Sequence, residues 1–314
     1  MATKISLIGA GNIGGTIALL AAIKNLGNIV LIDIAKGLAK GKALDISHSL
    51  PVLQCNRQIT GTASLKQMKD SKIIVITAGF PRKEGMSRDD LVEINLKVMK
   101  TVGKAIKKYS PKSFVIVVTN PLDVMTWAIQ KITNIPFSHV VGMAGVLDTS
   151  RFEFHLAEAL NISAQNVSST VLGGHGDDMV ALLRHTTVSG SKLEEIVKKK
   201  KITQQKINEI VKRIRTCGAE IITYMGTSAY FSPAASTVQM IECYLRDQKK
   251  ILPCSAYLKG QYGFKNIYAG VPVVLGANGV EKIIEISLKN EEKKEFLKSI
   301  KSIQSVLDIA KKLF

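Results

Sequence analysis

The sequence has 314 residues, about twice the length of a common single domain, so two lobes or one large α/β unit are expected. Hydrophobic residues make up 46% of the chain and charged residues 22%, a balance that excludes a disordered chain, a collagen and a coiled coil. The 43 lysines and arginines exceed the 25 acidic residues and give a net charge of +18.

This basic charge invites a nucleic-acid or membrane-surface interpretation, but the positions of the lysines weaken it. In residues 291–314 the lysines lie off the apolar face of an amphipathic helical pattern, as in a solvated helix. The dense run at 198–201 has no interleaved aromatic residues on which bases could stack. We therefore expect no specific nucleic-acid partner.

Cysteine usage and the N-terminal segment bear on the compartment. The four cysteines form no C-x-x-C pair, which argues for a reducing compartment and against a disulfide scaffold or a metal site. We interpret them as buried small hydrophobic residues. The apolar run at 5–23 resembles a signal peptide, but its glycines interrupt the helix that a signal needs. Since no other apolar run approaches the ~20 residues that span a bilayer, we expect a cytoplasmic protein without a membrane partner.

Along the chain, short β-branched runs alternate with helical patterns in the first half. Such alternation predicts a parallel sheet covered on both faces. The predicted strands are residues 4–8, 29–32, 73–77, 114–118 and 139–141. A helix is predicted to begin at Ser87 with a capping box and to end before Pro111.

Past about residue 145 the pattern changes to long helices and hairpin-like strands. Helices are predicted over 207–225, from Ser232-Pro233 onward, and over 291–314. With no linker or repeat between the halves, we expect two closely packed domains, 1–145 and 146–314, with a cleft between them.

A glycine motif directly follows the first predicted strand. Gly9-Ala10-Gly11-Asn12-Ile13-Gly14 matches the G-x-G-x-x-G fingerprint, whose glycines allow a tight turn and the approach of a pyrophosphate to a helix N-terminus. Nineteen residues after Gly14, Asp33 ends the next strand, where a carboxylate binds ribose hydroxyls and repels a 2′-phosphate. Together with the parallel sheet, these residues predict a dinucleotide-binding domain that prefers NAD.

Three polar residues in the second half suggest a catalytic site. His175 lies between glycines, and Asp148 and Arg151 have the i, i+3 spacing that places both on one face of a helix. Beside an NAD site they suggest a general base, its orienting carboxylate and a clamp for a substrate carboxylate. Asp177 and Asp178 are alternative partners for His175 that the sequence leaves open.

Several segments together resemble the lactate/malate dehydrogenase family over nearly the whole chain. They are the glycine fingerprint, Val118-Thr119-Asn120-Pro121, residues 147–151 and Gly173-Gly174-His175-Gly176. Residues 78–88 resemble the malate-specific version of the family's active-site loop. The resemblance implies a doubly wound Rossmann domain followed by a C-terminal α/β substrate domain, and reversible hydride transfer between NAD and a 2-hydroxy acid.

The resemblance also implies a role for each matching residue. His175 exchanges a proton with the substrate, Asp148 orients the His175 imidazole, and Arg151 binds the C1 carboxylate. Arg88 polarises the reacting carbonyl, and Asn120 bonds the substrate oxygen and precedes a cis peptide bond. Asn95 and Val118 border the cofactor.

The identity of the acid depends on Arg82. In a glycine-flanked loop, this arginine could pair with a second carboxylate, which favours L-malate and oxaloacetate as substrates. Lactate is the alternative, because lactate-specific members of the family typically lack an arginine there. An alternative of a different class is a basic NAD-binding protein with a nucleic-acid or regulatory role. We also expect a homo-oligomer, either a dimer or a tetramer.

Overall fold

The fold is organised around one large sheet. The computed structural model describes residues 3–81 and 88–314, Arg88 by its backbone alone, and in this part of the chain the sheet has nine strands. In spatial order they are β3 (Ile59–Thr62), β2 (Asn28–Ile32), β1 (Lys4–Ile8), β4 (Ile73–Ile76), β5 (Phe114–Val117), β6 (Val140–Gly142), β12 (Lys250–Lys259), β13 (Lys265–Gly276) and β14 (Gly279–Ile283). The strands β3 to β6 run parallel, and the order reverses between β1 and β4, which makes a doubly wound sheet.

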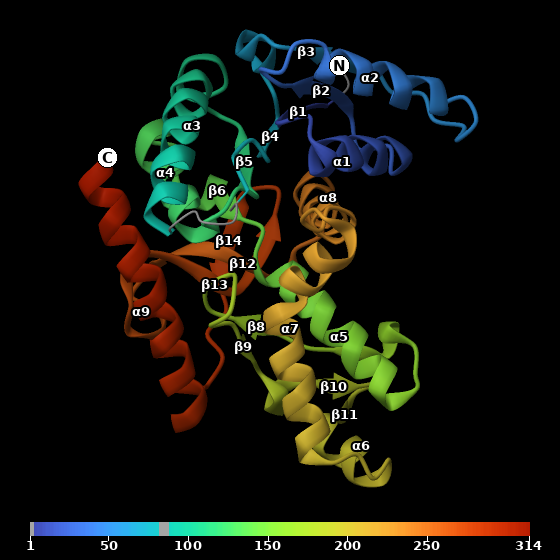
Figure 1. Ribbon diagram of the computed structural model, residues 1–314, viewed down its shortest axis with the longest axis vertical. Helices are drawn as coiled ribbons and strands as arrows, with labels where there is room; N and C mark the ends of the chain where they lie inside the picture. The colour runs from blue at the N-terminus through green and yellow to red at the C-terminus, as the bar shows by residue number, and fades with distance from the viewer. Residues whose placement is uncertain (1–2, 82–87) are drawn as a thin grey trace.

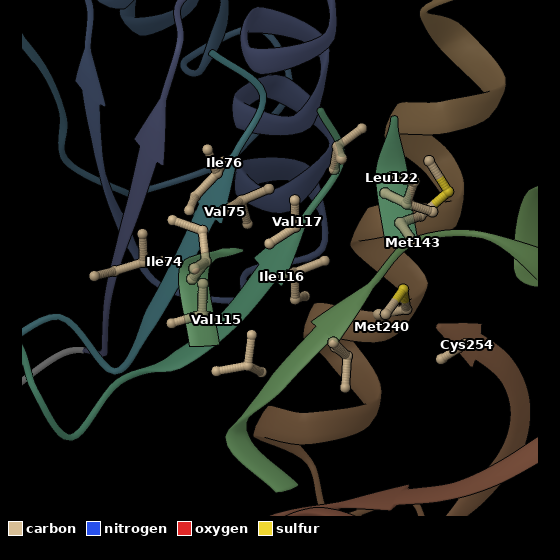
Figure 2. Close-up of a cluster of buried hydrophobic side chains, with 14 of the residues drawn as sticks. Ile74, Val75, Ile76, Val115, Ile116, Val117, Leu122, Met143, Met240 and Cys254 are labelled. Atoms are coloured by element: carbon tan, nitrogen blue, oxygen red, sulfur yellow. The ribbon is translucent and has the colours of Figure 1, made fainter. Parts of the chain in front are cut away.

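The centre of the parallel sheet is apolar on both faces because helices cover both. Ile74 of β4 pairs with Val115 of β5, and both side chains are fully buried. Figure 2 shows these strands in one cluster with Met240 and Cys254, so the core continues into the C-terminal half. Each buried aliphatic side chain of this size contributes roughly 1.5–3 kcal/mol.

Two groups of helices flank the parallel strands (Figure 1). On one side α3 (Arg88–Tyr109), α4 (Leu122–Thr133) and the C-terminal α9 (Asn290–Leu313) pack on one another. On the other side α1 (Asn12–Ile23) packs against α8 (Phe231–Leu245) and α2 (Leu38–Ser49). The start of α1 and the start of α4 are thereby placed at the carboxyl ends of β1 and β5, the edge where ligands bind in such sheets.

The C-terminal half adds a second apolar core. The helix α5 (Gly145–Leu160) lies against α7 (Gln204–Met225), with Phe152 and Ile214 buried between them. The remaining elements are β7 (Val167–Ser168), β10 (Thr187–Val188) and β11 (Ser191–Lys192) in one small sheet, β8 (Val171–Leu172) and β9 (Val180–Ala181) in another, α6 (Leu193–Lys199), and the 3₁₀ turns Leu65–Met68, Phe137–His139, Ala164–Asn166, Leu183–His185 and Gln261–Gly263.

The predicted mixed α/β class is confirmed, and the predicted strands of the first half are present within one residue at each end. The helix predicted to end before Pro111 ends at Tyr109, while its predicted start at Ser87 lies outside the described residues. The short edge strand β3 was not predicted, because Thr60 and Gly61 break its apolar pattern. The antiparallel extension of the sheet by β12, β13 and β14 was not predicted either.

The four cysteines are free thiols. Cys217, Cys243 and Cys254 are buried as predicted, whereas the prediction was wrong for Cys55, which is only partly buried in the turn after α2. No helix within residues 3–81 and 88–314 is long and apolar enough to cross a membrane.

Candidate active site

The turn from β1 into α1 fits a dinucleotide. Gly9 has φ +107°, and a Cβ there would lie 2.6 Å from Thr77 Oγ1, so only glycine fits. A Cβ on Gly14 would collide with the Gly9 carbonyl oxygen. At Gly11, by contrast, nothing within the described residues lies within 4 Å of the Cβ position. That opening is where the backbone could receive a pyrophosphate.

The start of α1 has the character of an anion site. The helix begins at Asn12, and in the described part of the chain no side chain caps it and no acidic residue lies in its first turn. Its first N–H groups and the positive end of its dipole therefore face the opening at Gly11. Ala10 and Ile13 complete the turn on its inner side, Ala10 fully buried and Ile13 partly buried.

Asp33 follows β2 and supports this turn. Its Oδ2 accepts a hydrogen bond from the Ala10 amide at 2.7 Å, and its Oδ1 accepts one from the Ala35 amide at 2.8 Å. Each oxygen keeps a second lone pair, and the side chain is half-exposed, so the carboxylate can also accept from ribose hydroxyls.

Lys42 of α2 is a residue of this region that the sequence reasoning missed. Its Nζ donates to the Gly11 carbonyl at 2.9 Å and lies beside Gly15. Burial lowers the pKa of Lys42, and the negative charge of Asp33 partly offsets this by raising it. A cation and an anion thus flank the glycine turn.

The carboxyl end of β5 carries the next group of predicted residues. Val118 is buried, Asn120 is exposed, and the bond from Asn120 to Pro121 is cis. Asn95 of α3 is fully buried: its amide donates to the Asn120 carbonyl at 2.7 Å and its oxygen accepts from the Phe80 amide at 2.8 Å. Asn95 therefore holds the main chain on both sides of the site, and its side chain is not open to a ligand.

His175 lies in the loop between β8 and β9 and faces the first turn of α5. Its Nδ1 is 2.9 Å from Asp148 Oδ2, and the Asp148 carboxyl is only 2% exposed. Its other ring nitrogen, Nε2, makes no hydrogen bond to the residues that the structure describes, and the side chain is 16% exposed. The ring is thus held at one nitrogen and open at the other, as a proton carrier requires.

The environment of His175 favours its charged form. Burial alone would lower the pKa of the imidazole, but the charge and hydrogen bond of Asp148 outweigh it, with a smaller contribution from Asp123 against the opposing charge of Arg151. The pKa of His175 is therefore raised above 6.5. The Asp148 carboxylate therefore stabilises the imidazolium that forms when the ring accepts a proton.

The two alternative partners of His175 lie elsewhere. Asp178 forms an ion pair with Lys298 of α9 at 3.0 Å, and Asp177 is exposed. The carboxylate that bonds the ring is that of Asp148.

Arg151 lies one turn after Asp148 on α5. Its guanidinium is 3.7 Å from Asp148 Oδ1, beyond hydrogen-bond distance. Both Asp148 Oδ1 and Arg151 Nε are buried without a hydrogen-bond partner in the described part of the chain. Buried donors are rarely left unpaired, so the free Nε of Arg151 fits an anionic ligand that accepts from the guanidinium, whereas the Asp148 oxygen is an acceptor that such a ligand does not satisfy.

Another carboxyl group, that of Asp123 of α4, lies beside the loop and was also missed. It lines a cavity of about 190 Å³ together with His175 and Ser299 of α9. Desolvation by burial raises its pKa to about 6, although the hydrogen bond from Ser255 and the charge of His175 lower it.

Two predicted residues cannot be placed. Arg82 lies outside the described residues, and of Arg88 only the backbone, at the start of α3, is described. Within the described residues no group of three or more His, Cys, Asp or Glu could hold a metal ion.

Comparison with known proteins identifies the family. Two family models match: the lactate/malate dehydrogenase NAD binding domain over residues 3–142, and the lactate/malate dehydrogenase alpha/beta C-terminal domain over residues 145–313. The malate dehydrogenase of Methylobacterium radiotolerans is 51% identical over 309 residues, which are 98% of this chain and 97% of that protein.

Solved structures agree with this result. Malate dehydrogenase from Cryptosporidium parvum is 43% identical, with a TM-score of 0.97 over 99% of this chain and 100% of that one. Lactate dehydrogenase from the same organism, complexed with lactic acid and β-nicotinamide adenine dinucleotide, is 41% identical, with a TM-score of 0.96 over 99% and 98% of the two chains. The protein belongs to the lactate/malate dehydrogenase family, and its first half is the NAD-binding domain of that family.

Proposed function

We propose that the protein catalyses the reversible oxidation of L-malate to oxaloacetate with NAD. The observation that carries this proposal is the 2.9 Å contact between His175 Nδ1 and Asp148 Oδ2, made one helical turn from Arg151. A proton carrier and a carboxylate clamp are what oxidation of a 2-hydroxy acid needs from the protein. The 51% identity to a malate dehydrogenase over nearly the whole chain supports malate as that acid.

Bound NAD supplies the acceptor for the hydride that leaves C2 of the substrate. Gly9, Gly11, Gly14 and the first turn of α1 would hold the pyrophosphate, and Asp33 the adenosine ribose. His175 starts neutral, with its Nδ1 proton donated to Asp148, and takes the substrate hydroxyl proton at Nε2. In the reverse direction it starts as the cation and returns that proton. Asp148 fixes the ring tautomer and stabilises the cation.

Substrate recognition is assigned to four polar residues. Arg151 binds the C1 carboxylate through its planar fork, and Asn120 bonds the reacting oxygen. Arg88 polarises the carbonyl, and Arg82 pairs with the distal carboxylate of the dicarboxylate. The unpaired Nε of Arg151 supports the first of these roles.

We assign residues 1–145 to cofactor binding and residues 146–314 to the substrate. The beginning of α5 at Gly145, just ahead of Asp148, supports this boundary. A homo-oligomer is also proposed, and the exposed apolar side chains of Leu44, Val52 and Leu53 on and after α2 support a subunit interface there. Free thiols support a cytoplasmic location.

Lactate is the alternative substrate, supported by the 41% identity to a lactate dehydrogenase. Loss of NADH absorbance should be measured with oxaloacetate and, separately, with pyruvate. We expect oxaloacetate to be reduced with the higher kcat/KM, and a preference for pyruvate would assign the lactate activity instead. If the protein binds NADH but reduces neither oxaloacetate nor pyruvate, the result would favour the regulatory NAD-binding role.

A control for this assay is available among the other histidines. His139 lies at the amino end of β6, at the opposite edge of the sheet from the site, so His139→Asn should leave the rate with oxaloacetate within about twofold of the parent. His175→Asn should not.

A further inference from the structure

Asp123 joins three elements beneath the proposed catalytic histidine. It is the second residue of α4 and is 7% exposed. Its Oδ1 accepts a hydrogen bond from Ser255 Oγ of β12 at 2.6 Å, and its Oδ2 accepts one from the His175 main-chain N–H at 3.4 Å. The two oxygens thus connect α4, β12 and the loop between β8 and β9.

The main chain of this loop is held at three successive residues. The Gly173 amide donates to the Gly270 carbonyl at 2.9 Å, the Gly174 amide to Ser299 Oγ at 2.8 Å, and the His175 amide to Asp123. Asp123 is the one ionisable acceptor among the three. It therefore holds the backbone of the histidine, whereas Asp148 holds the ring.

Asp123 also lies three residues after Asn120, the proposed ligand of the reacting substrate oxygen. His175 and Asn120 must meet the same oxygen for the proton and the hydride to move together. The Asp123 carboxyl directly connects the segment that carries Asn120 with the backbone of His175. The aspartate side chain is short, so a hydrogen bond from it can hold the His175 and Asn120 segments at a fixed separation.

A charged group at this place is unfavourable for folding. Burial raises the pKa of Asp123 to about 6, so at neutral pH the protein keeps a carboxylate where desolvation disfavours one. Buried charge that weakens the fold is expected where it serves a site. The Asp123 charge in turn acts on His175, whose pKa it raises less strongly than Asp148 does.

We propose that Asp123 is a positioning residue for the reaction, which fixes the main chain of His175 relative to Asn120 so that both side chains reach one substrate oxygen. This inference rests on the proposed function of His175. The other charged groups that act on His175 are Asp148 and Arg151 of α5. Asp178 of the same loop is paired with Lys298 of α9.

Two variants separate the hydrogen bonds of Asp123 from its charge. Asn in its place can accept from His175 and donate to Ser255, which keeps the connection without the charge. Asp123→Asn should therefore keep kcat for oxaloacetate reduction within about tenfold of the parent, and the fall of kcat/KM at high pH should move to lower pH. Asp123→Ala removes the connection and should lose roughly 10²-fold in kcat, while the Kd for NADH stays within about twofold.

Asp178→Asn is the matched control, since it neutralises an acid of the same loop that does not contact His175. Asp178→Asn should change kcat by no more than about twofold and should leave the pH profile of kcat/KM unchanged. The proposal is overturned if Asp123→Ala retains kcat within about threefold, if NADH affinity falls in parallel with kcat, or if Asp123→Asn loses as much kcat as Asp123→Ala. Near-UV circular dichroism of each variant checks that it is folded.

A second readout keeps this inference distinct from the proposed function. The pKa of His175 can be followed by NMR on protein labelled at histidine nitrogens, with His175→Asn assigning the signal. A lower His175 pKa in Asp123→Asn supports the place of the Asp123 charge beside His175 even if the parent does not reduce oxaloacetate, in which case the proposed function alone fails. An unchanged His175 pKa would show that no Asp123 charge acts on the ring, and it overturns this placement of Asp123 whatever the activity.

Discussion

The guanidinium of Arg151 lies 3.7 Å from Asp148 Oδ1, and the other oxygen of the same carboxylate bonds His175 at 2.9 Å. One buried carboxylate therefore stands between the proposed proton carrier and the proposed carboxylate clamp. Because Asp148 Oδ1 lies beyond hydrogen-bond distance of the guanidinium, the guanidinium keeps donors for a ligand.

Replacing Arg151 with lysine tests the clamp. Arg151→Lys keeps the charge but loses the planar fork that can make two parallel bonds to a carboxylate. We expect kcat/KM for oxaloacetate to fall roughly 10²-fold, about 2.7 kcal/mol, with an unchanged Kd for NADH. Steady-state kinetics and a fluorescence titration with NADH measure the two quantities. Arg246→Lys, on the exposed end of α8, is the control, and equal kinetics for both variants would remove Arg151 from the site.

Cofactor choice is predicted to depend on Asp33. Its carboxylate would repel the 2′-phosphate of NADP, whereas Lys42 nearby would attract it. Asp33→Ser should therefore narrow the preference for NAD, measured as the ratio of kcat/KM with NADH and NADPH. Asp33→Asn controls for the lost bonds to Ala10 and Ala35, because its oxygen can keep one of them. Equal use of NADH and NADPH by the parent would contradict the assignment.

The proton-transfer role predicts a separation of chemistry from cofactor binding. His175→Asn should lower the rate at least ~10²-fold, because the substrate oxygen loses its acid/base partner. The Kd for NADH should stay close to that of the parent, since the glycine turn and Asp33 lie on other elements. A rate within tenfold of the parent would show that the substrate proton has another carrier.

Substrate choice is predicted to depend on Arg82. Loss of one partner from a desolvated charge pair typically costs about 2–5 kcal/mol, so Arg82→Gln should lose roughly 10²-fold or more in kcat/KM for oxaloacetate. Pyruvate should be reduced better, because glutamine leaves no unpaired cation in a closed site. The measurement is the ratio of kcat/KM for oxaloacetate to that for pyruvate. An unchanged ratio would show that Arg82 is a solvent-facing side chain that does not bind the substrate.

The pH dependence of stability should reveal the buried charge of Asp123. The pKa rises from 3.8 to about 6 on folding, so the folded protein binds the proton more tightly and stability falls as pH rises through this window. The charge then costs about 3 kcal/mol above pH ~6. Asp123→Asn should be more stable than the parent by up to that amount at neutral pH, and the difference should vanish below about pH 4. Urea unfolding across this range measures it, and a pH-independent difference would argue against a buried charge.

Local features of the sequence were sufficient to predict the cofactor-binding residues of the first half. The glycine turn, the strand before it and Asp33 lie within one short stretch, where spacing along the chain fixes spacing in the fold. Local spacing could not identify the acid that bonds His175, because Asp148, Asp177 and Asp178 were all compatible with the sequence. Only the packing of the β8–β9 loop on α5, and the capture of Asp178 by Lys298, distinguishes Asp148.

Asp123 and Lys42 could not be found by such reasoning. In sequence, Asp123 reads as an ordinary acid in the first turn of a helix, stabilised by the dipole. Its contact with Ser255 spans 132 residues and depends on the sheet continuing from β6 into β12, which no local pattern encodes. Lys42 in the same way is one lysine among many until α2 folds back over the glycine turn.

The junction between β6 and β12 also has a consequence for folding. The two strands pair through Gly142 and Ser255, and a Cβ on Gly142 would lie 2.8 Å from Ser255 Cβ, so the halves meet without a gap. A fragment cut at residue 145 would leave the outer edge of β6 without its neighbour, and an open strand edge recruits other chains. The cooperative folding unit therefore extends beyond the cofactor-binding segment, and that segment made alone should self-associate until residues 250–283 are supplied.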